Sequence, residues 1–396
     1  MNIKKEFDIF KNQSWLTYLD SASSTQKPNY VLSHTSDYIL NNYANIGRWQ
    51  YSLAEKSDEY FFKTKEKIGE LTNSNPKDIF FTYNATYGIN IIWHALIGSG
   101  LLVSGDEIIV GIAEHHANIL IWQYLAKKHN IVIKYLPLDD KSEYDIQNLS
   151  KIVSTNTKLI ALGLSSNVLG NKNNLDKIRQ IVWQDVIVVI DAAQAIAHYS
   201  IDINNLDCDI CVRSAHKFFA YTGLGIVHIK KKLSDRISPT ILWGGTIQDV
   251  DKYNYKLNTD ISKREPGTPN IISIVSLYHA IDRRNSIDGY NKLEIIERDL
   301  IMYTLEKFEK LDKKVKLVNT RSENRIGIFA FETIGKNSNH INSILDQNNV
   351  CVRVGWHCAH PLHQELNIWS NIRLSLHIYN DRSDINKFFK VLESAT

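Results

Sequence analysis

The feature that most constrains this sequence is the uninterrupted apolar run Val186–Ile190, which is followed directly by Asp191. A strand that is apolar on both faces belongs between two layers of helices. Shorter apolar runs alternate with amphipathic segments through the first two-thirds of the chain; strands are expected at 79–82, 107–111, 131–138, 159–164 and 210–212, and helices at 87–96 and 119–125. The alternation predicts an α/β fold with a largely parallel sheet and helices on both sides.

The pattern changes after about residue 271. Apolar residues then recur at helical spacing from Leu293 to Thr304, which predicts one long helix. Strands are expected at 326–331 and 350–354, and a last helix near the end of the chain. With 396 residues, the chain is longer than one hydrophobic core usually serves. We therefore expect a large domain (31–270), a smaller α+β domain (271–396), and an amino-terminal segment (1–30) that packs with the smaller one.

Bulk composition excludes several classes of protein. The formal net charge is only +3, with 43% hydrophobic and 22% charged residues, so neither nucleic acid nor an anionic membrane is expected as a partner. The chain opens without the apolar core of a secretory signal, and no apolar stretch is long enough to span a bilayer. Four cysteines without such a signal do not make a disulfide framework. We expect a cytoplasmic enzyme.

Polar residues follow several of the expected strands. Ligands gather at the carboxyl ends of parallel strands, and Asp191 lies at such an end. Its alternative role is to cap the next helix. Lys217 closes a second apolar strand in the sequence Ser214-Ala215-His216-Lys217, where a lysine usually has a lowered pKa or a covalent partner. Ser214 and His216 beside it carry groups that can bind a phosphate.

Asp191 and Lys217 on neighbouring strands fit one cofactor chemistry. Pyridoxal 5′-phosphate (PLP) needs a lysine for its Schiff base and an acid against the pyridine nitrogen. The acid keeps that nitrogen protonated, which makes the ring an electron sink.

The segments that carry these residues resemble a known family. Residues 188–195 (Val-Val-Ile-Asp-Ala-Ala-Gln-Ala) and 214–217 resemble the cofactor segment of class V aminotransferase-like enzymes, and specifically of the group II cysteine desulfurases and selenocysteine lyases. Further motifs of that family occur in order from about Tyr18 to the last helix, at 18–22, 26–28, 86–90, 114–118, 166–170 and 267–270. The resemblance implies the PLP-dependent transferase fold type I.

The resemblance also implies a role for each matching residue. Lys217 would hold PLP, His115 would stack on its ring, and Asp191 would face the ring nitrogen. The other implied cofactor contacts are Ala85, Thr86, Asn167, Gln194, Ser214, His216 and Thr268. Backbone N–H groups at a helix start favour an anion near Thr86 independently of any family. Thr268 would come from a second subunit, which implies a homodimer.

Residues 353–362 (Arg-Val-Gly-Trp-His-Cys-Ala-His-Pro-Leu) resemble the family's active-site cysteine loop. Cys358 would take sulfur from L-cysteine as a persulfide and leave L-alanine, with a sulfur-acceptor protein as a further partner. A buried structural thiol is the alternative for such a cysteine. Arg373 matches the arginine that clamps the substrate carboxylate. Arg353, His357 and Asn167 are the other expected substrate contacts.

The sequence departs from the family around the substrate pocket. Gly47 and Tyr51 stand where the family has histidines, with Arg48 retained between them, and Trp356 replaces another histidine. His360 follows Cys-Ala in the cysteine loop. Two alternatives therefore stay open. One is a PLP-dependent C–S or C–Se lyase, β-eliminase or epimerase that acts on a different amino acid. The other is a non-catalytic sulfur-relay scaffold.

Cys208 and Cys211 form a C-x-x-C pair, which can indicate a metal or redox site. Positions i and i+3 of a strand face opposite sides, so we expect both to be packing residues. Cys351 is expected in the core of its strand. No group of residues has the spacing of a metal site.

Overall fold

The computed structural model describes residues 3–47 and 51–396, so Arg48 lies outside the described residues. A seven-stranded sheet has the order β2-β8-β7-β6-β5-β3-β4 and is parallel except for β8. Its strands are β2 (Ile79–Thr82), β3 (Glu107–Gly111), β4 (Val132–Leu136), β5 (Thr157–Gly163), β6 (Ile187–Asp191), β7 (Ile210–Ser214) and β8 (Gly225–Ile229). The α/β architecture with a mainly parallel sheet is confirmed.

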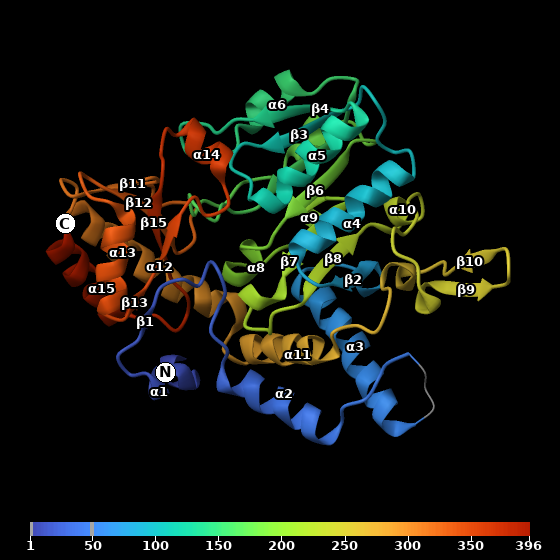
Figure 1. Cartoon of the computed structure of the whole chain (residues 1–396), viewed down its shortest axis with the longest axis horizontal. Coiled ribbons are helices and arrows are strands. Elements are labelled where there is room, and N and C mark those ends of the chain that lie inside the picture. Colours follow the sequence, from blue (N-terminus) through green and yellow to red (C-terminus); the bar gives the residue numbers. More distant parts are fainter. Residues whose placement is uncertain (1–2, 48–50) are drawn as a thin grey trace.

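Strand β6 shows why the fold has three layers, with the sheet between two layers of helices. Its alternate residues Val188 and Ile190 pack into one hydrophobic cluster, while Ile187 and Val189 pack into another on the opposite face. Helices α4 (Ala85–Gly98) and α5 (Leu120–His129) cover the second face. Helices α2 (Asn29–Asn41), α3 (Ser52–Leu71) and α11 (Ile271–Ser286) cover the first (Figure 1). Each face of the sheet is therefore buried, as the doubly apolar strand requires.

The carboxyl-terminal part contains a second, antiparallel sheet. Its order is β11-β12-β15-β14, formed by β11 (Val315–Leu317), β12 (Ile328–Thr333), β15 (Asn371–Ser375) and β14 (Arg353–Gly355). Helices α12 (Gly289–Glu309), α13 (Ser338–Gln347) and α15 (Arg382–Ala395) share its core. The single strand expected at 350–354 is two strands, because β13 (Val350–Cys351) pairs with β1 (Thr17–Tyr18) and β14 pairs with β15.

The expected domains depend on two points: segment 1–30 should pack with the smaller domain, and the smaller domain should begin at residue 271. In the structure β1 pairs with β13, and α11, which begins at Ile271, packs on α2 and α3. The division of the chain into domains stays a prediction. The remaining elements are α1 (Asp8–Asn12), α6 (Ile146–Ile152), α7 (Ile178–Ile181), α8 (Ala195–His198), α9 (Ile203–Leu206), α10 (Lys231–Ser234), α14 (His360–Glu365) and the hairpin strands β9 (Ile247–Val250) and β10 (Tyr255–Leu257).

Within residues 3–47 and 51–396, no helix has the length and apolar character needed to cross a membrane.

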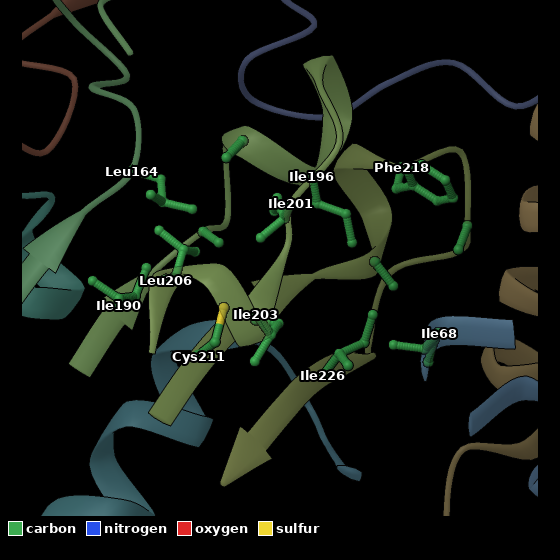
Figure 2. Packing of buried hydrophobic residues seen from close by; sticks show 14 of the residues in the cluster. Ile68, Leu164, Ile190, Ile196, Ile201, Ile203, Leu206, Cys211, Phe218 and Ile226 are labelled. Carbon is green, nitrogen blue, oxygen red and sulfur yellow. The ribbon is translucent and has the colours of Figure 1, made fainter. Parts of the chain in front are cut away.

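The cysteine pair Cys208 and Cys211 lies in the hydrophobic cluster shown in Figure 2, which labels Cys211. Both thiols are fully buried, and both belong to this one cluster. The expectation that they face opposite sides of a strand is wrong, because Cys208 precedes β7, which begins at Ile210. Both thiols are nevertheless packed among apolar side chains.

Buried histidines make the stability of this fold depend on pH. His377 is 2% exposed, and burial, His198 and Arg284 lower its pKa well below the ordinary value. The unfolded chain binds a proton at this position below pH ~6.5 whereas the folded protein does not, so stability falls as pH falls. Between pH 7.5 and about pH 5, we expect the free energy of unfolding to fall by about 2 kcal/mol less in His377→Leu than in the wild type. Urea unfolding of both proteins at the two pH values measures this difference; equal losses would contradict it.

Candidate active site

A cavity of about 280 Å³ lies at the carboxyl ends of β5, β6 and β7. A small ligand is the usual occupant of a cavity of this kind at this edge of a parallel sheet. The structure brings eleven of the expected site residues to its wall: Ala85, Thr86, His115, Asn167, Asp191, Gln194, Ser214, His216, Lys217, Arg353 and Arg373. The cavity therefore unites residues that are more than 280 positions apart in the chain, from Ala85 to Arg373.

Lys217 and Asp191 form the charged centre of this cavity. Asp191 ends β6, and Lys217 lies in the short helical turn directly after β7, the neighbouring strand. Burial lowers the pKa of Lys217 to about 8, although the Asp191 carboxylate favours its charged form. Burial also raises the pKa of Asp191, whose Oδ1 accepts a hydrogen bond of 2.9 Å from the Ala193 N–H. A lysine with this pKa supplies a neutral amine near physiological pH, as Schiff-base lysines do.

His115 is a neutral imidazole in this cavity. Burial, followed by the charge of Lys217, lowers its pKa to about 3. Its Nδ1 accepts a hydrogen bond of 3.1 Å from the Ala117 N–H, which leaves the proton on Nε2. The ring can therefore stack on a planar cofactor without adding positive charge to the site.

Glu114, next to His115, is a buried carboxyl that sequence reasoning gave no role. It accepts hydrogen bonds from Asn118 Nδ2 (2.7 Å), from the Gly163 N–H (2.5 Å) and from the Tyr144 hydroxyl. Burial raises its pKa to about 7. Tyr144 also lines the cavity, and no motif in the sequence surrounds it. This bonded group fixes the segment that carries His115.

One end of the cavity is suited to an anion. Helix α4 begins at Ala85, and its N-cap residue Asn84 accepts a hydrogen bond from the Tyr87 N–H. The Ala85 N–H lies 3.4 Å from Ser214 Oγ. The positive end of the helix dipole and the Ser214 hydroxyl group together favour a phosphate here.

Two arginines also line the cavity. Arg353 on β14 pairs directly with Arg373 on β15. Arg373 is 1% exposed, and it donates hydrogen bonds to Asp20 Oδ1 (3.0 Å), Ser23 Oγ (2.8 Å) and the Asn167 carbonyl (3.1 Å). Sequence reasoning assigned no role to Asp20 or Ser23, although both lie in or beside the amino-terminal motif. A buried guanidinium held in this way is a ready partner for a carboxylate.

Cys358 lies close to this arginine pair but outside the cavity wall. Its Sγ is 3.7 Å from Arg353 Nη2, which donates to it. His357 is 3% exposed and turned away from the cavity: its Nε2 bonds Asn371 Oδ1 at 2.5 Å, and its carbonyl accepts from Asn167 Nδ2 at 2.6 Å. The structure therefore places the Cys358 thiol, and not the His357 ring, beside the arginines.

Thr268 is not brought together with Lys217. It lines a separate cavity of about 250 Å³, together with Tyr87 and Asn270. Its role at the phosphate stays a prediction that requires a second copy of the chain.

The residues of the main cavity fit PLP. They provide the lysine, the carboxylate, the neutral stacking imidazole and the anion-binding helix start described above. A buried polar atom is also left free: Gln194 Oε1 has no hydrogen-bond partner among the described residues, although Gln194 Nε2 donates to the Ala22 carbonyl at 3.0 Å. Buried polar atoms are normally satisfied, so this one is explained by a polar ligand in the cavity.

Comparison with known proteins agrees with this geometry. Residues 17–388 match the family described as aminotransferase class-V. A cysteine desulfurase of Wigglesworthia glossinidia brevipalpis is 33% identical over 397 residues, which cover 98% of this chain and 96% of the relative.

Solved structures agree over the whole chain as well. The apo structure of a cysteine desulfurase from Thermococcus onnurineus NA1 has a TM-score of 0.93 at 28% identity and covers 99% of this chain and 96% of its own. A C-DES structure with glycine covalently linked to the PLP cofactor shares the fold, with a TM-score of 0.84 at 20% identity and coverage of 98% of both chains. This chain therefore belongs to the aminotransferase class-V family, and it matches the cysteine desulfurases of that family over its full length.

Proposed function

We propose that this chain is a PLP-dependent cysteine desulfurase that converts L-cysteine to L-alanine and takes the sulfur on Cys358 as a persulfide. The observation that carries the proposal is the position of the thiol. Cys358 Sγ lies 3.7 Å from Arg353, and Arg353 lines the same cavity as Lys217 and Asp191. A nucleophilic sulfur is thus beside the place where a PLP-bound amino acid would lie.

PLP supplies an electron sink that stabilises negative charge at the α-carbon of a bound amino acid. Asp191 would hold a proton at the cofactor's ring nitrogen, and the buried position of its carboxylate would strengthen that interaction. The Lys217 amine, with its pKa of about 8, accepts and returns the substrate's α-proton. His115 would stack on the ring, and Ala85, Thr86, Ser214 and His216 would hold the phosphate.

The sulfur transfer balances without a further reactant. The Cys358 sulfur attacks the substrate sulfur, so that an S–S bond forms while the substrate's C–S bond breaks. The carbon keeps the electron pair of the broken bond and takes a proton, which yields alanine. Sulfur is oxidised to the persulfide level, and the carbon is reduced to a methyl group. The Arg353 guanidinium, which donates to Cys358 Sγ, stabilises negative charge on the attacking sulfur.

Arg373 positions the substrate in this proposal. Its planar guanidinium can grip a carboxylate through two parallel hydrogen bonds, which a lysine cannot reproduce. We expect Arg373→Lys to raise KM for L-cysteine by about 10- to 100-fold, since hydrogen bonds to charged groups contribute about 1.5–3 kcal/mol. Steady-state kinetics measures this change. Arg353→Lys is the matched comparison: it should lower kcat more than it raises KM, and the same response in both variants would contradict the separate roles.

We also infer that the active unit is a homodimer. Thr268 lines the second cavity and not the one that contains Lys217, so within one chain it does not reach the expected phosphate site. The hairpin β9–β10 projects from the body in Figure 1 and exposes apolar side chains, with Tyr253 90% and Val250 59% exposed. A second copy that covers this surface would bring Thr268 to its phosphate site. Sedimentation of the purified protein tests this; a monomer with full activity would contradict it. The persulfide would then pass to a sulfur-acceptor protein.

The first test of the function is direct. The purified protein is expected to be yellow, to convert L-cysteine to alanine in equal amount to persulfide, and to release sulfide when a reductant is added. A panel containing L-selenocysteine, D-cysteine and other amino acids separates this activity from that of a lyase, eliminase or epimerase. A yellow protein that leaves L-cysteine unchanged but consumes another member of the panel would overturn the proposal.

A further inference from the structure

The cysteine loop, residues 356–359, has an unusual backbone. His357 and Cys358 both have left-handed φ angles, 47° and 58°. This conformation costs a non-glycine residue roughly 1–2 kcal/mol, and two in succession persist only where surrounding bonds fix them. The position of the Cys358 thiol therefore depends on the groups that hold this loop.

Buried amides hold the loop from the inside. Asn167 Nδ2 donates to the His357 carbonyl at 2.6 Å, and His357 Nε2 bonds Asn371 Oδ1 at 2.5 Å. Asn371 in turn bonds His363 Nε2 at 3.1 Å, and His363 Nδ1 bonds the Ala359 carbonyl at 2.9 Å. These contacts lie on the side of the loop that faces the protein core.

His116 and His360 hold the loop from its outer side. The His116 N–H donates to the Cys358 carbonyl at 2.7 Å. His116 Nε2 accepts from the His360 backbone N–H at 3.2 Å and lies 2.9 Å from His360 Nδ1. Because a backbone N–H can only donate, His116 Nε2 is the acceptor, and His360 Nδ1 carries the shared proton.

Trp356 restricts the His360 ring. The two rings are stacked, with centroids 4.4 Å apart and planes only 7° apart. His360 and Trp356 are among the residues at which the sequence departs from the family resemblance. The stack and the paired imidazoles therefore make one connected unit that joins the cysteine loop to His116, the residue directly after His115.

We propose that His360 is a positioning residue for sulfur transfer: stacked on Trp356, it fixes His116, which fixes the Cys358 carbonyl and thereby the thiol beside Arg353. This inference rests on the proposed function and deepens it. His360 acts on the loop and is not among the residues that line the cavity. Its loss should slow persulfide formation without weakening substrate binding.

The test compares His360→Ala with His360→Asn. An asparagine amide N–H can replace the imidazole Nδ1–H, whereas alanine offers no donor. We expect His360→Ala to lower the single-turnover rate of persulfide formation by about 10- to 100-fold, which is the effect of misplacing a reacting group by about 1 Å. KM for cysteine should stay within about twofold of the wild-type value, and the cofactor's absorption spectrum should be unchanged. His360→Asn should recover most of the rate. His360→Gln, whose amide lies one methylene further out, replaces His360→Ala in the comparison if the alanine variant does not fold. The control is His340→Ala, which removes an exposed histidine on α13.

Hydrogen exchange of peptides covering residues 353–362 tests positioning without substrate. His360→Ala should exchange faster there than the wild type, and His360→Asn should not. Hydrogen exchange still tests the positioning role if the wild type is inactive on cysteine. That inactivity would overturn the proposed function but not the positioning of the loop. Two results would overturn the positioning role. In one, the wild type forms persulfide and His360→Ala forms it at the same rate; in the other, His360→Asn is as slow as His360→Ala.

Discussion

Cys358→Ser is expected to abolish persulfide formation while the protein stays yellow. A serine hydroxyl is a far weaker nucleophile toward sulfur than a thiol, so the rate of sulfur transfer should fall by more than about a thousandfold. Lys217, Asp191 and His115, which we propose to bind the cofactor, line the cavity wall, whereas Cys358 lies outside it, so the substitution should leave the proposed PLP site intact. Mass spectrometry of the Cys358 peptide after addition of L-cysteine, alongside the visible spectrum, measures both outcomes.

Cys351→Ser is the matched control for this experiment. Cys351 lies on β13 and is partly exposed like Cys358, so the expectation that it is a core residue is wrong. Partial burial nevertheless raises the pKa of its thiol. A raised pKa lowers the fraction of reactive thiolate. We expect this variant to form persulfide on Cys358 at the wild-type rate. Persulfide that persists in Cys358→Ser, or that disappears in Cys351→Ser, would move the acceptor role to another cysteine.

The strands that could be predicted are those that can be recognised from their own apolar residues, without knowledge of the strands that they pair with. β6 is apolar on both faces and could be placed from its residues alone. β8 (Gly225–Ile229) was not predicted: its apolar run resembles the others, but its antiparallel direction depends on pairing with β2 and β7. The split of residues 350–354 into β13 and β14 has the same cause. Their partners, β1 and β15, lie in distant parts of the chain.

The cofactor side of the site was predictable because its residues follow strands directly. Asp191 and Lys217 come after β6 and β7, and parallel neighbours end at the same edge of a sheet. The part of the site around Cys358 could be predicted less well from the sequence. A motif cannot show that left-handed backbone angles turn the His357 ring inward and leave the Cys358 thiol at Arg353.

Long-range polar contacts were the least predictable. Arg373 was predicted to clamp a carboxylate, but its partner Asp20 lies 353 positions earlier in the chain. Tyr144 reaches Glu114 from a segment without any motif. Such pairs arise from the way separate elements pack together, and nothing in either local sequence indicates them.

Lys217→Ala is expected to eliminate turnover, with a loss of about a thousandfold or more, because the variant lacks both the cofactor attachment and the base for the α-proton. Burial lowers the pKa of Lys217 to about 8 from its usual value near 10.5. Uptake of PLP by the wild-type apoprotein should therefore become faster as pH rises to about 8 and then level off, since the neutral amine is the reactive form. Absorbance during reconstitution at a series of pH values measures this.

Lys27 provides the internal comparison for this result. It is the other lysine whose pKa burial lowers strongly, to about 7, but its amine donates to the Thr25 carbonyl at 2.8 Å and the His216 carbonyl at 3.0 Å. A low pKa alone therefore cannot select the attachment site; the lysine must also line the cavity, as Lys217 does and Lys27 does not. Borohydride reduction of the holoenzyme should attach the cofactor to the Lys217 peptide, and the label should vanish in Lys217→Ala without appearing on Lys27. A label on the Lys27 peptide would show that pKa, rather than position at the end of β7, selects the lysine.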